Sequence, residues 1–384
     1  MTVEYFSQKL NDWKNAALIR RRYPFSDRKA NLIKYQSKTY LNFSSNDYLG
    51  LENHPDIKES IQQGVEKYGF GSSASCLVSG YSQMHEAVEN QFSEWLGVDR
   101  TLLFSSGYHA NLGVITSFAT RQNTIFSDKF CHASILDGIQ LSRAKHFRYA
   151  HNNISHLSNL CLRHKPDFLI TESVFSMEGD IAPISQLVEL AQTHHAGLIL
   201  DDAHGIGVLG QKGKGILEYA KIHPSQITCL ILPLGKAFNG MGGMVAGQSE
   251  IIEHILQFAR SYRYTTGLPP AVCSGLLASL KLVSQEAWRR EKLQENIFNF
   301  NQSAQKQGLA LISSEPTPIR SINLKDNKLV LKVQEGLLED GFYVSAIRPP
   351  TVPQNTARIR ISLNALHSKK QIDYLIERIL YHRS

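Results

Sequence analysis

A lysine, an aspartate and a histidine stand just past the places where buried strands are expected to end. Residues 227–232 form a continuous, partly β-branched apolar run that predicts a buried strand, and Lys236 follows it. Residues 197–200 predict another strand, which is followed by Asp201 and, three residues later, by His204. Open α/β sheets bind their ligands at the carboxyl edge of the strands, so these three side chains are candidates for ligand binding.

Each candidate also has an ordinary interpretation. Lys236 is either a solvated loop charge or a Schiff-base former, and Asp201 with His204 is either a turn cap beside a satisfied histidine or a ligand-binding pair. An isolated carboxylate at the end of a buried strand is costly, so Asp201 must be paired or hydrogen-bonded. A pyridinium N–H would satisfy it, and His204 could then reach a phenolate oxygen on the same ring.

A short turn offers an anion-binding position. Ser106, Gly107 and Tyr108 lie between an expected strand at 101–104 and an expected helix at 111–120. Backbone N–H groups at such a position face any anion at the N-terminus of the helix, and a phosphate is the natural occupant.

One cofactor explains these elements jointly. His132 could stack on a planar ring, although a satisfied core histidine is the alternative. Pyridoxal 5′-phosphate (PLP) needs a lysine for its aldehyde, a carboxylate for its ring nitrogen, a helix N-terminus for its phosphate and a flat group against its faces. We therefore expect PLP as the cofactor.

Two nucleotide-binding motifs are excluded. Gly205–Gly210 matches the glycine pattern of dinucleotide sites, but Asp201–His204 separates it from the strand, and Lys212–Gly215 prevents a helix from opening there. The pair Gly235-Lys236 is not part of an ATPase phosphate loop, because Leu230 stands where the first glycine is required.

Composition limits the class of protein. The chain has 384 residues, a formal net charge of +7 and five cysteines that form no CxxC pair. Dispersed cysteines argue for reduced thiols in a cytoplasmic protein and against a disulfide or zinc framework, so no metal is expected. No apolar run reaches the length of a membrane span, the N-terminus does not have the pattern of a signal peptide, and no dense basic block indicates nucleic acid.

The order of the expected elements indicates the fold class. Strands alternate with helical patterns and are expected at 101–104, 124–127, 146–149, 168–171, 197–200 and 227–232. Such alternation predicts an α/β fold with a mostly parallel sheet that is covered on both faces. A helix is expected at 3–22, and from about residue 280 a long charged helix, short strands and a final helix predict a smaller domain. We expect an N-terminal segment at 1–45, a large domain at 46–279 and a small C-terminal domain at 280–384.

Long motifs in this chain resemble those of the α-oxoamine synthases. These segments are Asn42–Leu51, Ser105–Asn111, Thr171–Asp180, Asp201–Gly205 and Gly235–Ala237. That family consists of fold-type-I PLP enzymes that condense an amino acid with an acyl thioester, and the likeness runs from about residue 18 to about 367. The resemblance implies an aspartate aminotransferase-like α/β fold, a mostly parallel central sheet, a smaller C-terminal α+β domain and a homodimer with shared active sites.

One segment resembles a particular branch of the family. Ala346–Pro353 and Thr356–Arg360 are similar to the segments of members that join L-alanine to a pimeloyl group in biotin synthesis. The implied substrates are L-alanine and pimeloyl-CoA or a pimeloyl-acyl carrier protein. The alternatives are relatives that use glycine, of the aminolevulinate synthase or glycine C-acetyltransferase type, and a PLP-binding protein without turnover.

By position, the resemblance assigns roles to the four central residues. Lys236 corresponds to the lysine that binds the cofactor covalently, Asp201 to the partner of its ring nitrogen and His204 to the partner of its phenolate oxygen, while His132 corresponds to the stacking histidine.

Further residues receive cofactor and substrate roles in the same way. The other cofactor-binding positions are Ser106, Gly107, Tyr108 and Ser176, together with Thr265 and Thr266, which reach the phosphate of the neighbouring subunit. The substrate-binding positions are Arg20, Asn46, Arg348, Thr351 and Arg360, of which Arg360 corresponds to the residue that binds the amino-acid carboxylate.

Two positions depart from the pattern of the family. Pro233 stands where a hydroxyl residue usually helps to hold the phosphate, and the loop Gly71–Ser75 has Ser73 and Ala74 where glycines are usual.

Overall fold

The computed structural model describes residues 3–384, and their contacts divide the chain into two compact units. The large unit comprises Asn53–Ser176 and Ile181–Arg290, and the small unit comprises Met1–Glu52, Met177–Asp180 and Glu291–Ser384. Residues 1 and 2 of the expected N-terminal segment lie outside the described part. The rest of that segment belongs to the same unit as the C-terminal region, and the second boundary falls at Arg290, where we expected residue 279.

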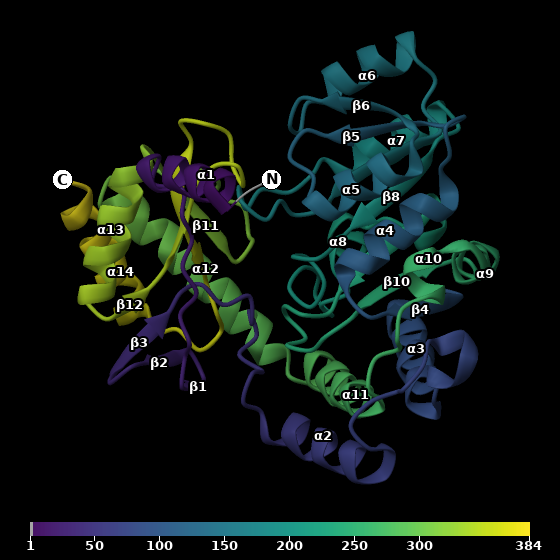
Figure 1. Cartoon of the computed structure of the whole chain (residues 1–384), viewed down its shortest axis with the longest axis horizontal. Helices are drawn as coiled ribbons and strands as arrows, with labels where there is room; N and C mark the ends of the chain where they lie inside the picture. The colour runs from purple at the N-terminus through teal and green to yellow at the C-terminus, as the bar shows by residue number, and fades with distance from the viewer. Residues whose placement is uncertain (1–2) are drawn as a thin grey trace. The chain divides into compact units, whose positions relative to one another are not determined.

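A seven-stranded sheet forms the centre of the large unit, in the order β4-β10-β9-β8-β7-β5-β6 (Figure 1). Its strands are β4 (Arg100–Phe104), β5 (Thr124–Asp128), β6 (Lys145–Tyr149), β7 (Phe168–Glu172), β8 (Gly197–Asp201), β9 (Cys229–Pro233) and β10 (Gly243–Gly247). The neighbours from β9 to β6 pair in parallel, whereas β10 is antiparallel to both β4 and β9. The predicted mostly parallel sheet is confirmed, and β10 is a strand that we did not predict.

Helices connect and cover these strands (Figure 1). They are α2 (Pro55–Tyr68), α3 (Gln83–Leu96), α4 (Gly107–Phe118), α5 (Ala133–Ser142), α6 (Ile154–Arg163), α7 (Ile184–Thr193), α8 (Ile216–Ala220), α9 (Ser249–Phe258), α10 (Arg260–Arg263) and α11 (Pro270–Gln285). The long α12 (Ala287–Lys306) crosses from the large unit into the small one. Helix α4 begins four residues before the expected start at residue 111, so the anion-binding turn lies on the first turn of this helix.

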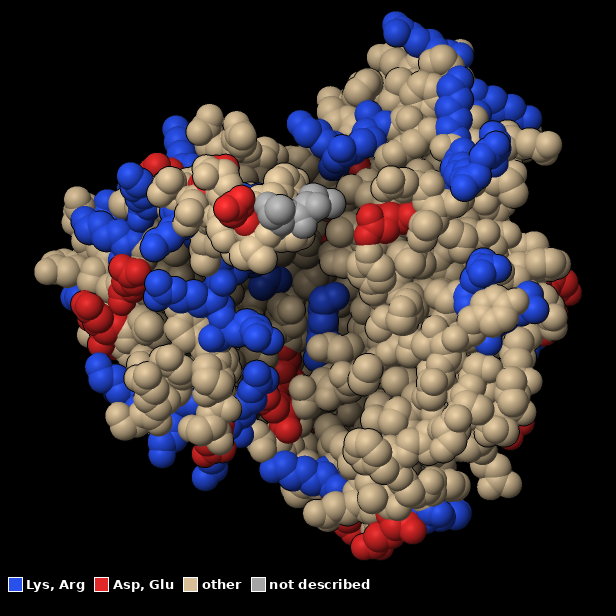
Figure 2. Space-filling view, in the orientation of Figure 1, with Lys and Arg blue, Asp and Glu red and all other residues tan. Residues whose placement is uncertain are grey.

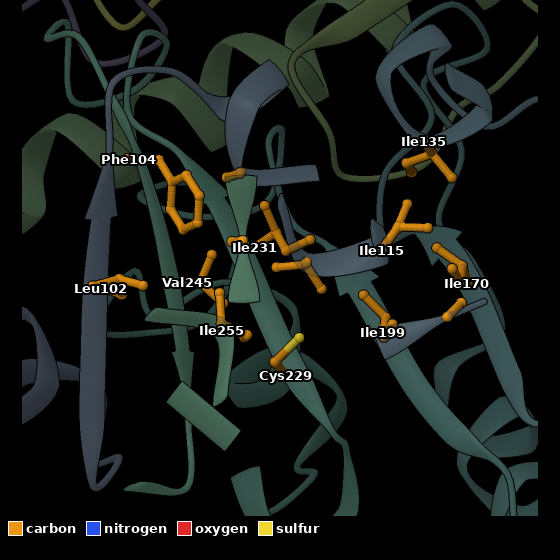
Figure 3. Packing of buried hydrophobic residues seen from close by; sticks show 14 of the residues in the cluster. Leu102, Phe104, Ile115, Ile135, Ile170, Ile199, Cys229, Ile231, Val245 and Ile255 are labelled. Carbon is orange, nitrogen blue, oxygen red and sulfur yellow. The ribbon is translucent and has the colours of Figure 1, made fainter. Parts of the chain in front are cut away.

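An apolar cluster holds the sheet against the helices on one of its faces. Side chains of neighbouring strands, including Val245, Ile231, Ile199 and Ile170, point toward Ile115 of α4 (Figure 3). These side chains are at most 2 % exposed. Burial of a side chain of this size stabilises the fold by about 1.5–3 kcal/mol. The carboxyl ends of the central strands are therefore anchored by packing.

The small unit contains two further sheets. One has the order β1-β2-β3-β12, and the other is antiparallel with the order β11-β14-β13. Their strands are β1 (Asp27–Lys29), β2 (Leu32–Tyr35), β3 (Lys38–Asn42), β11 (Ile319–Lys325), β12 (Phe342–Tyr343), β13 (Ser345–Ile347) and β14 (Ala357–Ser362). Helices α13 (Asn327–Glu339) and α14 (Lys369–Arg383) complete the unit, and Ser368 with Gln371 forms a capping box at the start of α14.

The N-terminal helix is shorter than predicted. Helix α1 is Val3–Asn15, whereas the apolar pattern predicted a helix over 3–22. Ala17 adopts a left-handed conformation with φ of 56°, and the N–H of Leu18 bonds back to the carbonyl of Trp13. This reversal ends the helix, so Arg20 lies in an extended segment and not at a helix end.

Candidate active site

The carboxyl ends of β8 and β9 bring the predicted catalytic residues together in the large unit. Asp201 is the last residue of β8 and pairs in register with Ile231 of β9, and Lys236 follows the end of β9 by three residues. Desolvation lowers the pKa of His132, while Asp201 raises it and Lys236 lowers it electrostatically. His132 therefore lies within the electrostatic field of both charged groups.

Asp201 is a buried carboxylate, since the residue is only 3 % exposed. Its Oδ2 accepts a hydrogen bond of 2.7 Å from Asn111 Nδ2, and its Oδ1 accepts one of 3.0 Å from the N–H of Ala203. Lys236 lies close enough to lower the pKa of the adjacent Asp202 electrostatically. A buried carboxylate bonded to neutral donors favours a cationic N–H as its remaining partner.

A chain of polar contacts joins Asp201 to His132. Asn111 Nδ2 also donates to Ser134 Oγ at 3.0 Å, and Ser134 Oγ lies 2.7 Å from His132 Nδ1. The backbone N–H of Ser134 points to the same Nδ1 at 3.2 Å, so Nδ1 is an acceptor and a neutral imidazole carries its proton on Nε2. These contacts fix the ring of His132, which also caps the N-terminus of α5.

We did not predict the roles of Asn111 and Ser134. Asn111 lies one turn after Gly107 on α4, and its Oδ1 is buried without a hydrogen-bond partner. The sequence offered one signal, since positions 107 and 111 share a face of a helix that begins at residue 107.

The N-terminus of α4 packs tightly against the ends of β9 and β10. Ser106 caps the helix by accepting the N–H of His109 at 3.1 Å. A Cβ on Gly107 would lie 2.5 Å from Cγ of Pro233, and a Cβ on Gly243 would lie 2.6 Å from Cα of Gly107. The proline that replaces the usual hydroxyl residue thus packs directly against the predicted phosphate-binding turn.

Asp202 organises the turn that contains His204. This carboxyl group is fully buried and accepts hydrogen bonds from the hydroxyl of Ser173 and, at 2.9 Å, from the N–H of Ile216. A Cβ on Gly205 or Gly215 would overlap the same carboxyl group. Burial raises the pKa of Asp202 to about 7. The sequence did not identify this role, because the hydrogen-bond partners of Asp202, Ser173 and Ile216, come from two other segments of the chain.

The remaining cofactor-binding candidates also belong to the large unit. His204 is buried, 4 % exposed, in the turn after β8, and Ser176 is the last residue before the chain enters the small unit. Thr266 forms an isolated β-bridge with Ser75, which places Thr265 and Thr266 beside the loop that departs from the family pattern. Tyr108 donates a hydrogen bond from its hydroxyl to Asp137 of α5.

Arg360 and Asn46 come together in the small unit. Arg360 lies on β14, is 5 % exposed, and donates to Asn46 Oδ1 at 3.2 Å from Nη2 and to Ser362 Oγ at 2.9 Å from Nη1. Tyr48 donates to the same Asn46 oxygen at 3.1 Å, and burial raises the pKa of Tyr48 to about 12. The guanidinium is therefore held in place by neutral acceptors.

The other three substrate-binding candidates form a second group in the small unit. Arg20 Nη2 donates to Thr351 Oγ1 at 3.2 Å and to the carbonyls of Arg348 and Pro349, each at 3.3 Å. Arg348 is 7 % exposed and donates to the carbonyls of Ala17 and Ile19. Arg20 and Thr351 are exposed, whereas the guanidinium of Arg348 joins two backbone segments.

Comparison with known proteins identifies the family. The family model described as "Aminotransferase class I and II" matches residues 38–379. The chain belongs to this family. An 8-amino-7-oxononanoate synthase of Methylococcus capsulatus is 45% identical over 88% of this chain and 87% of the relative, and one of Nitrosococcus oceani is 43% identical over 91% of this chain and 93% of the relative.

Solved structures of related enzymes share the fold. A serine palmitoyltransferase from S. paucimobilis matches with a TM-score of 0.94 and 26% identity, and the match covers 100% of this chain and 98% of that one. An 8-amino-7-oxononanoate synthase from Francisella tularensis matches with a TM-score of 0.79 and 36% identity over 88% of this chain and 96% of that one. The family and the fold class predicted from the motifs are confirmed.

Residues 3–384 contain neither a metal-binding cluster nor a helix suited to span a membrane. Within residues 3–384 no group of three or more His, Cys, Asp or Glu side chains is arranged to hold a metal ion. None of the helices described there combines the length and the hydropathy that crossing a bilayer requires.

The raised pKa of Asp202 predicts a pH dependence of stability. The ordinary pKa of this carboxyl group is 3.8, and its pKa in the folded protein is about 7. Between these pH values the folded state binds more protons than the unfolded state, so the stability of the protein falls as the pH rises through this window. In Asp202→Asn the amide oxygen can still accept the N–H of Ile216 and Nδ2 can donate to Ser173 Oγ, while the titration is removed. We expect the difference in unfolding free energy, wild type minus variant, to fall by up to about 4 kcal/mol from pH 4 to pH 8.

Urea unfolding at pH 4, 5, 6, 7 and 8 measures this difference. Glu89, whose pKa burial also raises to about 7, is present in both proteins, so its contribution cancels. The exposed Asp99→Asn substitution is the control and should leave the profile unchanged. Parallel profiles of wild type and Asp202→Asn would show that Asp202 is already ionised in the folded protein.

Proposed function

We propose that this protein is a PLP-dependent acyltransferase of the 8-amino-7-oxononanoate synthase type. It would condense L-alanine with a pimeloyl thioester and release CO2 and the free thiol. The identity of 42–45% to curated synthases over about nine-tenths of the chain supports the reaction. The observation that carries the chemistry is the buried Asp201, which lies on the strand beside the one that leads to Lys236.

The residues of the large unit fit PLP. Asp201 is buried and accepts hydrogen bonds from Asn111 and Ala203, and a pyridinium N–H would be a further, charged donor to it. The first-turn N–H groups of α4, at Gly107 and Tyr108, have no acceptor within their own helix and suit a phosphate. When bound, PLP withdraws electrons from the Cα of an attached amino acid and so stabilises negative charge there.

Lys236 would hold the cofactor and move the proton. Its Nζ would bind the cofactor before the amino acid arrives and would then act as the general base that removes the proton from Cα of alanine. The short connection from the buried strand β9 restricts the positions that its side chain can reach.

Three residues would fix the ring of the cofactor. Asp201 would keep the ring nitrogen protonated, His204 would bond the phenolate oxygen, and the imidazole of His132 would stack on one face. The contacts of His132 with Ser134 and of Asn111 with Asp201 support this arrangement, because they orient both groups before a ligand binds. Ser176 would be a further contact to the cofactor.

Arg360 would bind the carboxylate of alanine. Its guanidinium can form a bidentate pair with a carboxylate, and its bonds to Asn46 and Ser362 already orient it. On the acyl side, Arg20 and Thr351 would contact the pimeloyl group. Arg348 would support them by joining the backbone of residues 17–19 to the loop that begins at Arg348.

A homodimer would complete the phosphate site. Phe70 and Val78 are 92 % and 80 % exposed, and Tyr264 is also exposed beside the Ser75–Thr266 bridge. Burial of these apolar side chains against a second copy would place Thr265 and Thr266 at the phosphate of the partner. These threonines would supply donors that Pro233 cannot. A cytoplasmic location, expected from the dispersed free cysteines, is part of the same proposal.

Substrate competition tests the proposed reaction. Purified protein with PLP is mixed with alanine, glycine or serine and with pimeloyl, acetyl, succinyl or palmitoyl thioesters, and thiol release and product mass are followed. We expect alanine with the pimeloyl thioester to give the highest kcat/KM, by about tenfold or more over each competitor. A higher value for glycine with a short acyl group, or for serine with palmitoyl, would contradict the assignment and leave the family intact.

Covalent trapping tests the role of Lys236. Borohydride reduction of the holoenzyme followed by peptide mass analysis should place the cofactor on Lys236. Lys236→Ala should carry no covalent cofactor and should lose activity by about a hundredfold or more, because it also lacks the general base. Lys214→Ala, in a turn of the same unit, is the control. An adduct on another lysine in the wild type would refute the assignment.

Steady-state kinetics tests the role of Arg360. Arg360→Ala should raise the KM for alanine by about 10- to 100-fold through loss of a charge-assisted bidentate pair, and should leave covalent attachment of the cofactor unchanged. Arg360→Lys, which keeps the charge and loses the bidentate geometry, should lie between. The exposed Arg383→Ala is the control. An unchanged KM for alanine in Arg360→Ala would exclude this role.

A further inference from the structure

A hairpin that begins at Ser173 has its base in the large unit, whereas its tip, residues 177–180, belongs to the small unit. At the base, Val174 and Ile181 form an isolated antiparallel β-bridge. The N–H of Ser173 donates to the carbonyl of Asp201 at 2.8 Å. The base of the hairpin is therefore bonded to the end of β8, the strand that carries the proposed partner of the cofactor.

The hairpin tip is held closely by β11 and by the segment before it. Thr317 Oγ1 donates to the carbonyl of Gly179 at 2.6 Å, and Ser321 Oγ donates to the carbonyl of Met177 at 2.6 Å. Gly179 has a φ of 77°, and a Cβ on it would lie 2.5 Å from the carbonyl oxygen of Ile319. Glycine tolerates both the left-handed conformation and the close approach, so the tip fits tightly into its place in the small unit.

A buried ion pair joins the hairpin tip to β14. Arg358 Nη1 lies 2.8 Å from Glu178 Oε1 and also donates to the carbonyl of Met177 at 3.3 Å. Both charged residues are buried, whereas Figure 2 shows many other Lys and Arg side chains on the surface. Desolvation offsets much of the attraction within a buried pair, so stability alone is a weak explanation for it. The geometry that the pair imposes is the better explanation.

The contacts of the hairpin tip lie on the face of the sheet that carries Arg360. Arg358 precedes Arg360 by two positions on β14, so both side chains leave the same face of the strand. Ser321 is the register partner of Arg360 on β11, and residues directly opposite each other in antiparallel strands have Cα atoms about 4.5–5.5 Å apart. The tip is therefore bonded to two neighbours of Arg360, one along β14 and one across on β11.

We propose that Ser321 and Arg358 are positioning residues that fix Arg360 relative to the cofactor by holding the hairpin tip. This inference rests on the proposed function, because it requires that Arg360 bind the carboxylate of alanine while the amino group of alanine is at the cofactor. Ser176, the proposed cofactor contact, is followed directly by Met177, whose carbonyl both positioning residues hold.

The proposed reaction makes this distance critical. The amino and carboxylate groups of alanine are attached to one carbon atom, so the separation between the cofactor and the guanidinium of Arg360 is narrowly set. A misplacement of about 1 Å in such an arrangement can cost about a hundredfold in rate. Ties between the segment after Ser176 and the neighbours of Arg360 would keep that separation constant.

Binding of two amines to the holoenzyme tests the proposal, because ethylamine is alanine without its carboxylate. The affinity for each amine is measured from the change in absorbance of the cofactor in wild type, Ser321→Ala and Gly179→Ala. We expect both variants to bind alanine about threefold to tenfold more weakly and to bind ethylamine within about twofold of wild type, because the partner of the carboxylate is displaced. Ser321→Ala is the milder change and decides the question if Gly179→Ala does not fold.

A double variant shows whether the effect passes through Arg360. In Arg360→Ala/Ser321→Ala, the second substitution should alter the binding of alanine by less than about twofold, because the group that Ser321 positions is already absent. A loss that adds in full to the loss in Arg360→Ala would overturn the proposal.

Two matched variants change the small unit away from the hairpin tip. Gly308→Ala replaces a glycine with a φ of 71° whose added Cβ meets no heavy atom within 4 Å, and Ser26→Ala removes an exposed hydroxyl that donates to a carbonyl. Both should bind the two amines as wild type does. An equal loss for alanine and ethylamine in the tip variants, or no loss for either, would overturn the proposal. Unchanged alanine binding in Arg360→Ala would instead refute the proposed role of Arg360, on which this inference rests.

Discussion

Burial of the Asp201 carboxylate is the constraint on which the rest of the site depends. A charge at the end of a buried strand is costly unless partners compensate for it. The large unit supplies two hydrogen-bond donors, from Asn111 and Ala203. In the proposed site, a protonated ring nitrogen would be a further partner of this carboxylate, and the ring would supply the chemistry.

The scaffold around this carboxylate is rigid for identifiable reasons. Parallel pairing of β7, β8 and β9 fixes the strand ends, and the apolar cluster holds them against α4 and α5. Asp202 then fixes the following turn by bonding to Ser173 and Ile216, so His204 is positioned by a buried carboxyl group next to the functional one. The two adjacent acids thus differ: Asp202 holds the loop, whereas we propose that Asp201 binds the ligand.

Sequence patterns predicted the parts of the molecule that depend on local order. Apolar runs located the ends of β8 and β9, and with them Asp201 and Lys236, because strand burial is encoded residue by residue. Strand β10 was missed because glycines stand at both of its ends, and pairing with β4 and β9 determines its place. The tasks of Asn111, Asp202 and Arg348 could not be predicted, since their partners lie on other elements of the fold.

The protonation state of the ring nitrogen of bound PLP tests the central claim most directly. Nitrogen-15 NMR of holoenzyme that carries ring-labelled PLP reports this state at the atom itself. The buried Asp201 predicts a protonated nitrogen in the wild type at pH 8 and a deprotonated one in Asp201→Asn, with cofactor still bound in both. A deprotonated ring nitrogen in the wild type, or the same protonated signal in the variant, would contradict the role of this carboxylate.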